Sequence, residues 1–439
     1  MGFKKIDVKE INGFKLGNAE NQSAGTGCTV IISEQGAVAG VDIRGGGPAT
    51  RETDLLKSEN TVQAINAVVL SGGSAFGLES GSGVMKYLED KGVGFKVGER
   101  NIPIVTQASL YDLEVGSGDL RPDCEMGVQA CINAYDGIFD HGNYGAGTGA
   151  SVGKFYGMER AMKSSLGTFA CSDGILEVGA ITAVNAFGDV YNGNNNIIAG
   201  LLSKEKDYIK GSISVMKNHV HGEGGPEAPD IRDPFKNNEV NTTVKLDDAE
   251  VVDLADDNQH YDVSVEEREP VSNAQETNTQ TSVVSRTNDV DKSEIDEIES
   301  KIEELRAELE NNLESHNAVH GVATVEDESE YETIPVEEMG YDVPFNTTLS
   351  CLITNAKLTK TQANKLASIL HDGFARAIKP VHGTLDGDAI FVMTTNQVEV
   401  NFDAFAALAT DIMQYSVIDG ALAATDAYGL KASRSIISK

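Results

Sequence analysis

The sequence is short of several residue types, and each shortage excludes a class of protein. Its 439 residues contain no tryptophan and only five cysteines, and no two cysteines form a CxxC pair. This odd, scattered set is typical of reduced thiols rather than of a disulfide framework or a zinc site. No apolar run approaches the roughly 18 residues of a membrane span. The cysteines are Cys28, Cys124, Cys131, Cys171 and Cys351.

Basic residues are also scarce. The chain has 35 Lys and Arg against 68 Asp and Glu, a net charge of −33. Such a chain repels phosphate backbones, so we expect no nucleic-acid partner. The first residues, Met1 to Asp7, include no apolar segment of the kind found in signal peptides. We therefore expect a cytoplasmic protein that has no membrane partner.

Most of the negative charge lies in one block. Residues 221–340 hold 34 acidic and 8 basic residues, which is −26 of the net −33. The early part of this block has a disorder-like composition. From about 290 to 315, apolar residues at steps of three and four predict an amphipathic helix. This helix either packs against the body or a second copy of the chain, or it binds a partner. We interpret 216–340 as an insertion.

The flanks of the insertion have the pattern of a globular domain. We expect strands at 28–32 and 37–43 around a turn at 34–36, and further strands at 66–70 and 389–394. Helical periodicity covers 76–88, 360–377 and 402–422. Strands mixed with helices on both sides of the block predict one α/β or α+β layered domain, made of 1–215 and 341–439.

Several familiar motifs fail on inspection. The segment Gly145 to Lys154 resembles a phosphate loop, but Thr148 and Phe155 stand where that loop needs Gly and Ser or Thr. Around Ser74 the second glycine of a nucleophile elbow is displaced by one position. The histidines form no HExxH motif. We therefore expect no metal and no organic cofactor.

One constellation remains. Asn346-Thr347-Thr348 follows the acidic block and precedes an apolar run. By itself this is an ordinary strand entry. If the chain breaks between Asn346 and Thr347, however, the new α-amine lies beside the Thr347 hydroxyl. An α-amine has a pKa near about 7.7–8, so it serves as a general base for that hydroxyl near neutral pH.

Four further residues supply complementary chemistry. Asp386 and Asp388 place two carboxylates ahead of a strand, Lys154 offers a positive charge, and Asn185 offers an amide donor for an oxyanion. Each has a plain alternative as a turn residue or a solvated charge. The catalytic candidates are thus Thr347, Lys154, Asn185, Asp386 and Asp388.

A family resemblance joins these residues. The matching segments, in the same order on both sides of the acidic block, are Gly27–Ile32, Gly40–Leu56, Leu70–Leu78, Gly145–Lys154, Val184–Asp189, Asn346–Leu349, His371–His382 and Asp386–Asp388. Together they resemble the self-processing peptidase family of L-aminopeptidase/D-amidase/esterases, β-aminopeptidases and 6-aminohexanoate-oligomer (nylon-oligomer) hydrolases.

The resemblance implies an αββα sandwich similar to that of N-terminal-nucleophile hydrolases. It implies self-cleavage into an α chain, 1–346, and a β chain that opens with Thr347, and homo-oligomers of αβ pairs. It also implies hydrolysis of small peptides, amino-acid amides or 6-aminohexanoate oligomers through an acyl-enzyme. Thr347 would be the nucleophile and Asn185 the oxyanion donor, with Lys154, Asp386 and Asp388 completing the site. The β-aminopeptidases have Ser as nucleophile and Ser-x-Glu in place of Asp386-Gly-Asp388.

Two departures from the family pattern lie beside the scissile bond. Phe345 stands where relatives commonly have Gly, which we expect to slow cleavage, and relatives have a shorter linker in place of the acidic block. Two other functions stay open at this stage. One is an acyltransferase on the same scaffold, and the other is an uncleaved, non-catalytic scaffold whose acidic block recruits a partner.

Overall fold

The computed structural model describes residues 2–217 and 346–437. Most of the predicted insertion, its helix at about 290–315 and Phe345 lie outside the described residues. In chain order the elements are β1 (Lys4–Ile6), β2 (Lys15–Asn21), β3 (Thr26–Ile43), β4 (Ala49–Arg51), β5 (Ala64–Ser71), α1 (Ser80–Asp90), β6 (Phe95–Val97), β7 (Arg100–Ile102), β8 (Val105–Ser109), α2 (Cys124–Asp136), β9 (Ser151–Val152), β10 (Met162–Lys163), β11 (Leu166–Ser172), β12 (Glu177–Ala183), β13 (Asp189–Tyr191), β14 (Ile197–Ala199), α3 (Ser212–Lys217), β15 (Leu349–Ala356), α5 (Lys360–Ala377), β16 (Ile378–Lys379), β17 (Ala389–Val398), α6 (Phe402–Leu422) and α7 (Ser433–Ile437).

Ten strands from both sides of the predicted insertion form one hydrogen-bonded sheet. Their order is β1-β11-β12-β15-β17-β3-β5-β8-β4, with β2 also paired to β3. The pairs β15–β17 and β5–β8 are parallel, whereas the other neighbours are antiparallel. The segments before and after the predicted insertion therefore build a single sheet.

The expected turn at 34–36 is wrong, because β3 runs without a break through this region. Its first half pairs with β2 and β5, and its second half pairs with β17. The register with β5 shifts between Ile32 and Ala37, and Gly36 has a φ of 81°. A bulge with a left-handed glycine thus absorbs the change of direction that the sequence pattern suggested as a turn. Through this bulge β3 belongs to both halves of the sheet.

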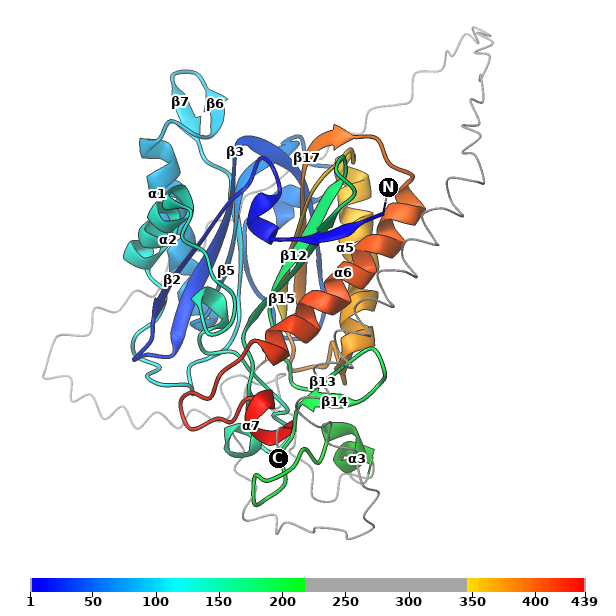
Figure 1. Cartoon of the computed structure of the whole chain (residues 1–439). Coiled ribbons are helices and arrows are strands. Elements are labelled where there is room, and N and C mark those ends of the chain that lie inside the picture. The colour runs from blue at the N-terminus through cyan, green and yellow to red at the C-terminus, as the bar shows by residue number, and fades with distance from the viewer. Residues whose placement is uncertain (1, 218–345, 438–439) are drawn as a thin grey trace, which may run out of the picture. The chain divides into compact units, whose positions relative to one another are not determined.

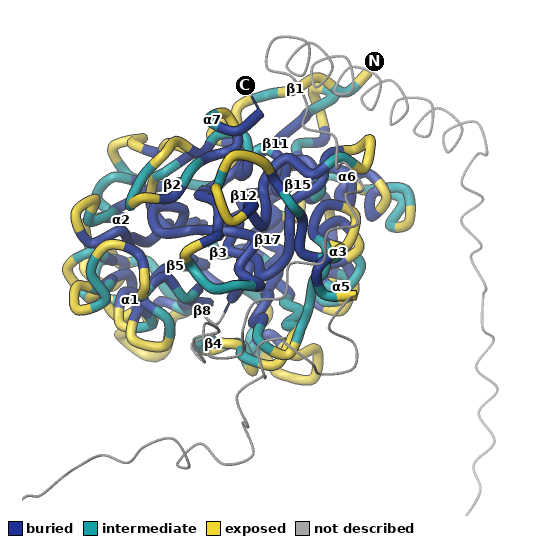
Figure 2. Tube along the Cα trace, turned by 90° about the horizontal axis from the view of Figure 1, so that it is seen from below, coloured by how far each residue is buried: buried dark blue, intermediate teal, exposed yellow. Residues whose placement is uncertain are grey.

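Alternation of side chains along the strands produces three apolar layers. Val30 and Ile32 of β3 pack with α1 and α2, while Ile31 faces the other way. In β17, Ile390 and Val392 pack with α5 and α6, while Phe391 and Met393 share the middle layer with Ile31. Figure 1 shows α1 and α2 on one side of the strands and α5 and α6 on the other. The middle strands are dark blue, and so buried, in Figure 2. The expected αββα arrangement of an α/β fold is confirmed.

The helices α5 and α6 both begin at a residue whose side chain caps the helix N-terminus. At the start of α5 the Thr359 side chain accepts from the Gln362 N–H and the Gln362 side chain accepts in return, a capping box. The Asn401 side chain caps α6 by accepting hydrogen bonds from the N–H groups of Asp403 and Ala404. The predicted helices at 360–377 and 402–422 are confirmed. The predicted helix at 76–88 is instead a 3₁₀ turn, Ser74–Glu79, followed by α1. No helix in the described part of the chain has the length and apolar character needed to cross a membrane.

Strand register brings distant segments to one edge of the sheet. Leu349 of β15 lies opposite Ala389 of β17 and opposite Ala183 of β12. The residues just before β15 therefore meet those just before β17 and those just after β12. These three short segments contain all of the candidate site residues except Lys154.

Glycine at position 40 is required where β3 passes under α5. A Cβ placed on Gly40 would lie 2.3 Å from the backbone of Ala363 and of Asn364. We predict that Gly40→Ala lowers the free energy of unfolding by about 1–3 kcal/mol, because the helix must move off the sheet. Urea denaturation measures this effect. Gly193→Ala is the matched control, because a Cβ there has nothing within 4 Å. Equal stability of the two variants would contradict the close packing.

Candidate active site

The peptide group between Asn346 and Thr347 is held on every side by backbone hydrogen bonds. Asn346 N–H donates to the carbonyl of Leu385 at 2.8 Å, and Asn346 C=O accepts from Gly387 N–H at 2.9 Å. Thr347 N–H donates to the carbonyl of Asn185 at 3.0 Å. Asn346, Thr347 and Asn185 are buried, so these hydrogen bonds fix the peptide in one orientation.

The Thr347 hydroxyl lies against the carbonyl of the residue before it. Its Oγ1 is 2.5 Å from the Asn346 oxygen, and the Thr347 residue is only 3% exposed. The same Asn346 oxygen accepts from Gly387 N–H. The Thr347 hydroxyl and the Gly387 N–H thus both donate to one carbonyl oxygen. A backbone N–H in this place can stabilise negative charge that develops on that oxygen.

Lys154 reaches the same place from the glycine-rich segment. Its backbone N–H donates to Phe187 C=O at 3.0 Å, and its Nζ donates to Asn185 Oδ1 at 2.7 Å and approaches the Asn185 carbonyl at 3.4 Å. Burial lowers the pKa of Lys154 to about 7, although the negative charges of Asp386, Glu114 and Asp112 act in the opposite direction. A lysine with this pKa exchanges its proton near neutral pH.

The Asn185 side chain is fully engaged at its oxygen. Oδ1 accepts from Lys154 Nζ and from Ser151 N–H at 3.1 Å, and Nδ2 donates to Tyr111 C=O at 3.0 Å. Asn185 therefore connects Lys154, Tyr111 and the Thr347 backbone. In this structure the donor that meets the Asn346 oxygen is Gly387 N–H rather than the Asn185 amide.

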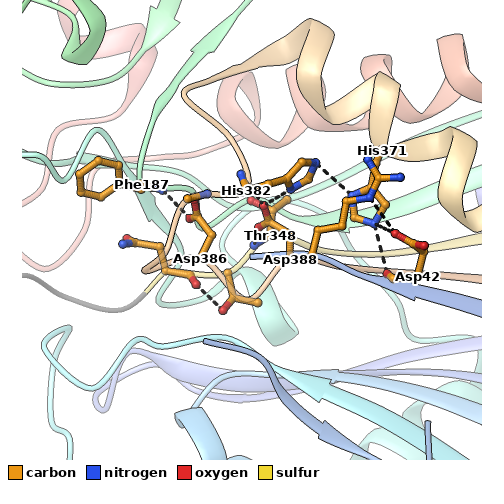
Figure 3. A network of polar contacts seen from close by, with 11 residues as sticks. Asp42, Phe187, Thr348, His371, His382, Asp386 and Asp388 are labelled. Atoms are coloured by element: carbon orange, nitrogen blue, oxygen red, sulfur yellow. Dashed lines mark hydrogen bonds and ion pairs between the residues drawn. The ribbon is translucent and has the colours of Figure 1, made fainter. Parts of the chain in front are cut away.

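Asp386 and Asp388 flank Gly387 but have separate partners. Asp386 accepts from Gly383 N–H at 2.7 Å and from Phe187 N–H at 3.4 Å, the latter drawn in Figure 3. Burial, and then the charge of Asp388, raise the pKa of Asp386 well above the ordinary carboxyl value. Asp388 accepts from Thr348 N–H at 2.6 Å and from His382 Nδ1 at 2.7 Å. Asp386 thus supports the loop, and Asp388 holds the peptide that follows Thr347.

A second buried lysine supports the segment that carries Lys154. Lys163 Nζ donates to the carbonyls of Gly147, at 3.1 Å, Ala150, at 3.0 Å, and Ser164. Burial lowers its pKa to about 7 as well. The carboxylate of Asp112 interacts electrostatically with Lys163 and accepts hydrogen bonds from Gly73 N–H and Thr26 Oγ1. Burial raises the pKa of Asp112 to about 6.

A hollow of about 250 Å³ opens beside these charges. It is lined by Glu114, Val115, Met158, Glu159, Lys206, Tyr428, Gly429 and Leu430. Glu114 links the hollow to the site, because its charge acts on Lys154. Within residues 2–217 and 346–437, no three His, Cys, Asp or Glu side chains group so that they could hold a metal ion.

All five candidate residues thus lie in one contact network around the Asn346–Thr347 peptide. Sequence reasoning missed Gly387, Lys163, Asp112 and Glu114, and it gave no role to His371 or His382. Gly387 acts through its backbone, which has no sequence signal beyond the flanking aspartates. Lys163 follows no motif at all. The two histidines did stand in a segment of the family pattern, which was the one available clue.

Comparison with known proteins identifies the family of the chain. A model of peptidase family S58 matches residues 6–217 and 270–434. The chain belongs to peptidase family S58. Peptidases hydrolyse amide bonds, so the expected family and reaction class are confirmed.

Relatives and solved structures give further detail. An uncharacterized aminopeptidase of Mycobacterium leprae is 38% identical over 199 residues, which cover 42% of this chain and 53% of that relative. A 6-aminohexanoate-oligomer endohydrolase of Kocuria sp. is 22% identical over 93% of this chain and 84% of its own. The L-aminopeptidase D-Ala-esterase/amidase of Ochrobactrum anthropi, described as a variant of the Ntn hydrolase fold, superposes with a TM-score of 0.51 at 13% identity over 96% of this chain and 86% of that chain. The expected N-terminal-nucleophile-hydrolase-like fold is therefore confirmed.

The buried Lys154 predicts a specific dependence of stability on pH. Its pKa is about 7 in the folded chain and 10.5 ordinarily, so the unfolded chain binds more protons between these values. Stability therefore rises with pH in this window. In a Thr347→Ala background, we expect Lys154→Met to flatten the increase between pH 7 and 9, as measured by urea denaturation. Lys365→Met, at an exposed position on α5, is the control. If the free energy of unfolding depends on pH in the same way in both variants, burial does not lower the pKa of Lys154.

Proposed function

We propose that this chain is a self-cleaving amide hydrolase whose nucleophile is Thr347. The observation that carries the proposal is the convergence of Thr347 Oγ1 and Gly387 N–H on the Asn346 carbonyl. A threonine at an ordinary strand entry needs neither a clamped preceding peptide nor a donor placed on its oxygen. The membership of the chain in a peptidase family supports the same reaction class.

Self-cleavage begins when Oγ1 attacks the Asn346 carbonyl carbon. The oxygen of that carbonyl takes the negative charge, and Gly387 N–H stabilises it. Collapse of this intermediate breaks the C–N bond, and the proton lost by the hydroxyl goes to the departing amine. Water then hydrolyses the ester between Asn346 and Oγ1. The products are a carboxylate on Asn346 and a free α-amine on Thr347.

The new amine supplies the base that the uncleaved chain lacks. It removes the proton from Oγ1 as the hydroxyl attacks a substrate amide, and then returns that proton to the leaving amine. Water, activated by the same amine, releases the acyl group. Lys154 shares the Asn185 carbonyl with the Thr347 nitrogen, so its charge holds the amine's pKa down. Asp388 keeps the following peptide in place through Thr348 N–H.

The substrates we propose are small amides or peptides with a free amino group. The hollow of about 250 Å³ has room for a small molecule, and its wall carries the carboxylates of Glu114 and Glu159 together with the ammonium group of Lys206. The relatives include proteins named aminopeptidase and 6-aminohexanoate-oligomer endohydrolase, whose names agree with such substrates. We further propose that the cleaved pairs assemble as homo-oligomers.

The nucleophile assignment is tested by intact mass under denaturing conditions. We expect the wild-type chain of 46.7 kDa to yield fragments of about 37 and 10 kDa, in proportion to their lengths. Thr347→Ala should remain a single chain and hydrolyse no amide, because both the hydroxyl and the new amine are lost. Thr347→Ser keeps a hydroxyl in the same place and should still cleave. An uncleaved variant with full activity would overturn the mechanism.

We propose that 218–269, the part of the acidic insertion outside the match to the family model, is dispensable for the chemistry. We expect replacement of 222–268 by a short Gly/Ser linker to leave the rate of self-cleavage within about twofold of wild type, because the entropic cost of connecting two fixed ends changes only slowly with linker length. Time courses of intact mass measure this rate. A folded variant that fails to cleave would make the segment part of the machinery.

A further inference from the structure

Two histidines form a chain of contacts behind Asp388. His382, in the loop before β17, places Nδ1 2.7 Å from Asp388 Oδ2. Its Nε2 lies 3.2 Å from Nδ1 of His371 on α5. Nε2 of His371 in turn lies 3.2 Å from the carbonyl and 3.3 Å from Oδ1 of Asp42. Figure 3 shows this chain running from Thr348 through Asp388 and the two rings to Asp42.

When Asp388 and Asp42 are both carboxylates, every contact of the chain is a hydrogen bond only if the two rings together hold three protons. Both ends of the chain, Asp388 and Asp42, present oxygens that accept, so each end needs an N–H from its ring. Two neutral imidazoles have two N–H groups in total, and both would be used at the ends. The Nε2 of His382 and the Nδ1 of His371 would then face each other as two lone pairs. A third proton between the rings turns that contact into a hydrogen bond.

The third proton belongs to His382. The His371 side chain is fully buried, and burial, with His382 and Arg44 nearby, lowers its pKa to about 3, so that ring stays neutral. His371 then accepts at Nδ1 and donates at Nε2 to Asp42. His382 donates at both nitrogens, to Asp388 and to His371. The cation thus lies directly against the carboxylate of Asp388, which makes this hydrogen bond charge-assisted.

Two carboxylates and one guanidinium group surround the His371–His382 pair. Asp388 faces His382 from the β17 side, and Asp42 faces His371 from the end of β3. Arg44 binds Asp42 Oδ1 through Nε at 2.8 Å and donates its backbone N–H to Asp388 C=O at 2.8 Å. On the α5 side the rings of His371 and His382 pack against Phe374, which carries no charge. The two carboxylates and Arg44 together carry one net negative charge, which balances one positive charge on the histidine pair.

The backbone of His382 adopts a conformation that glycine adopts more easily than histidine. Its φ is 59°, in the left-handed region that glycine adopts freely and other residues adopt at a free-energy cost. The next residue, Gly383, has no such φ. A glycine at 382 would relieve this strain. The histidine is held there by two hydrogen bonds to Asp388, from its ring and from its backbone N–H at 3.3 Å.

We propose that His382, supported by His371, is a positioning residue for the reaction of Thr347. It holds Asp388 in the orientation in which the other carboxylate oxygen accepts Thr348 N–H, and so fixes the Thr347 hydroxyl against its target carbonyl. His382 touches neither the nucleophile nor the scissile peptide in the contacts described above. The inference rests on the proposed self-cleavage, which serves as its assay because it requires no added substrate.

The decisive variants separate strain from positioning. His382→Gly relieves the left-handed backbone but removes the ring, so a merely structural role predicts an unchanged or more stable chain that cleaves normally. Positioning predicts self-cleavage slower by about 10- to 100-fold in a folded protein, as for other groups that orient a reacting side chain. His382→Asn tolerates the same φ and places an amide N–H where Nδ1 stood, so it should restore most of the rate. Imidazole added to His382→Gly should restore part of it.

Two controls complete the set. Glu52→Gly removes an exposed side chain at another left-handed residue, with a φ of 58°, and should leave the rate unchanged. His371→Phe keeps the ring shape but removes both nitrogens, and should slow cleavage without unfolding the chain.

Hydrogen exchange of the Thr348 amide separates the failure of this inference from the failure of the proposed function. In a Thr347→Ala background, we expect His382→Gly to speed exchange of this amide by at least tenfold, because its acceptor is no longer held. If wild type cleaves but His382→Gly cleaves equally fast with unchanged exchange, the positioning role is overturned and self-cleavage stands. If wild type never cleaves, self-cleavage is overturned, and the exchange of Thr348 alone decides whether His382 holds Asp388.

Discussion

The candidate site depends on the parallel pairing of β15 with β17. Leu349 lies opposite Ala389 in this pairing, so the two residues before one strand meet the Asp-Gly-Asp sequence before the other. The bridge between Asn346 and Asp386 continues the pairing beyond the strands, and it fixes the carbonyl beside Thr347. A shift of one residue in this register would replace Gly387 N–H by a side-chain-bearing neighbour and turn the Thr347 hydroxyl to the opposite face. Geometry at the site is therefore set by the same hydrogen bonds that build the sheet.

Buried charge is the second constraint. Lys154, Lys163, Asp112, Asp386 and Asp388 are all almost fully buried. None of these charges is stable there alone, because desolvation favours its neutral form. They persist because backbone groups satisfy them: three carbonyls around Lys163, Gly73 N–H on Asp112 and Gly383 N–H on Asp386. Burial moves the pKa values of Lys154, Lys163, Asp112 and Asp386 toward neutrality, which suits the proton transfers proposed for this site.

The sequence predicted the elements with strong periodicity and failed where pairing overrides local pattern. The helices at 360–377 and 402–422 and the strand after Asp388 carry regular apolar spacing, and the structure has them. The turn at Gly36 did not form, because β17 and β5 hold both halves of β3 extended. At the site, side chains with obvious chemistry could be named in advance. Gly387 could not, because its contribution is a backbone N–H whose direction depends on the fold, and the link from Asp388 through His382 to Asp42 spans residues that are distant in sequence.

The position of β15 in the sheet affects how a cleaved chain would unfold and refold. Its neighbours are β12, which precedes the Asn346–Thr347 bond in the chain, and β17, which follows it; β17 in turn lies beside β3. A chain opened at that bond therefore leaves its shorter fragment inserted in the middle of the sheet, flanked on both sides by strands of the longer one. The fragments would be interlocked by two ladders of hydrogen bonds and would share two of the three apolar layers, because the layer against α1 and α2 contains residues of the longer fragment only. Recovery from denaturation would then change from a unimolecular to a bimolecular event, and would slow as the protein is diluted. Opening the chain would thus make folding irreversible in practice, and the active form would be a kinetic product of a precursor that folded first.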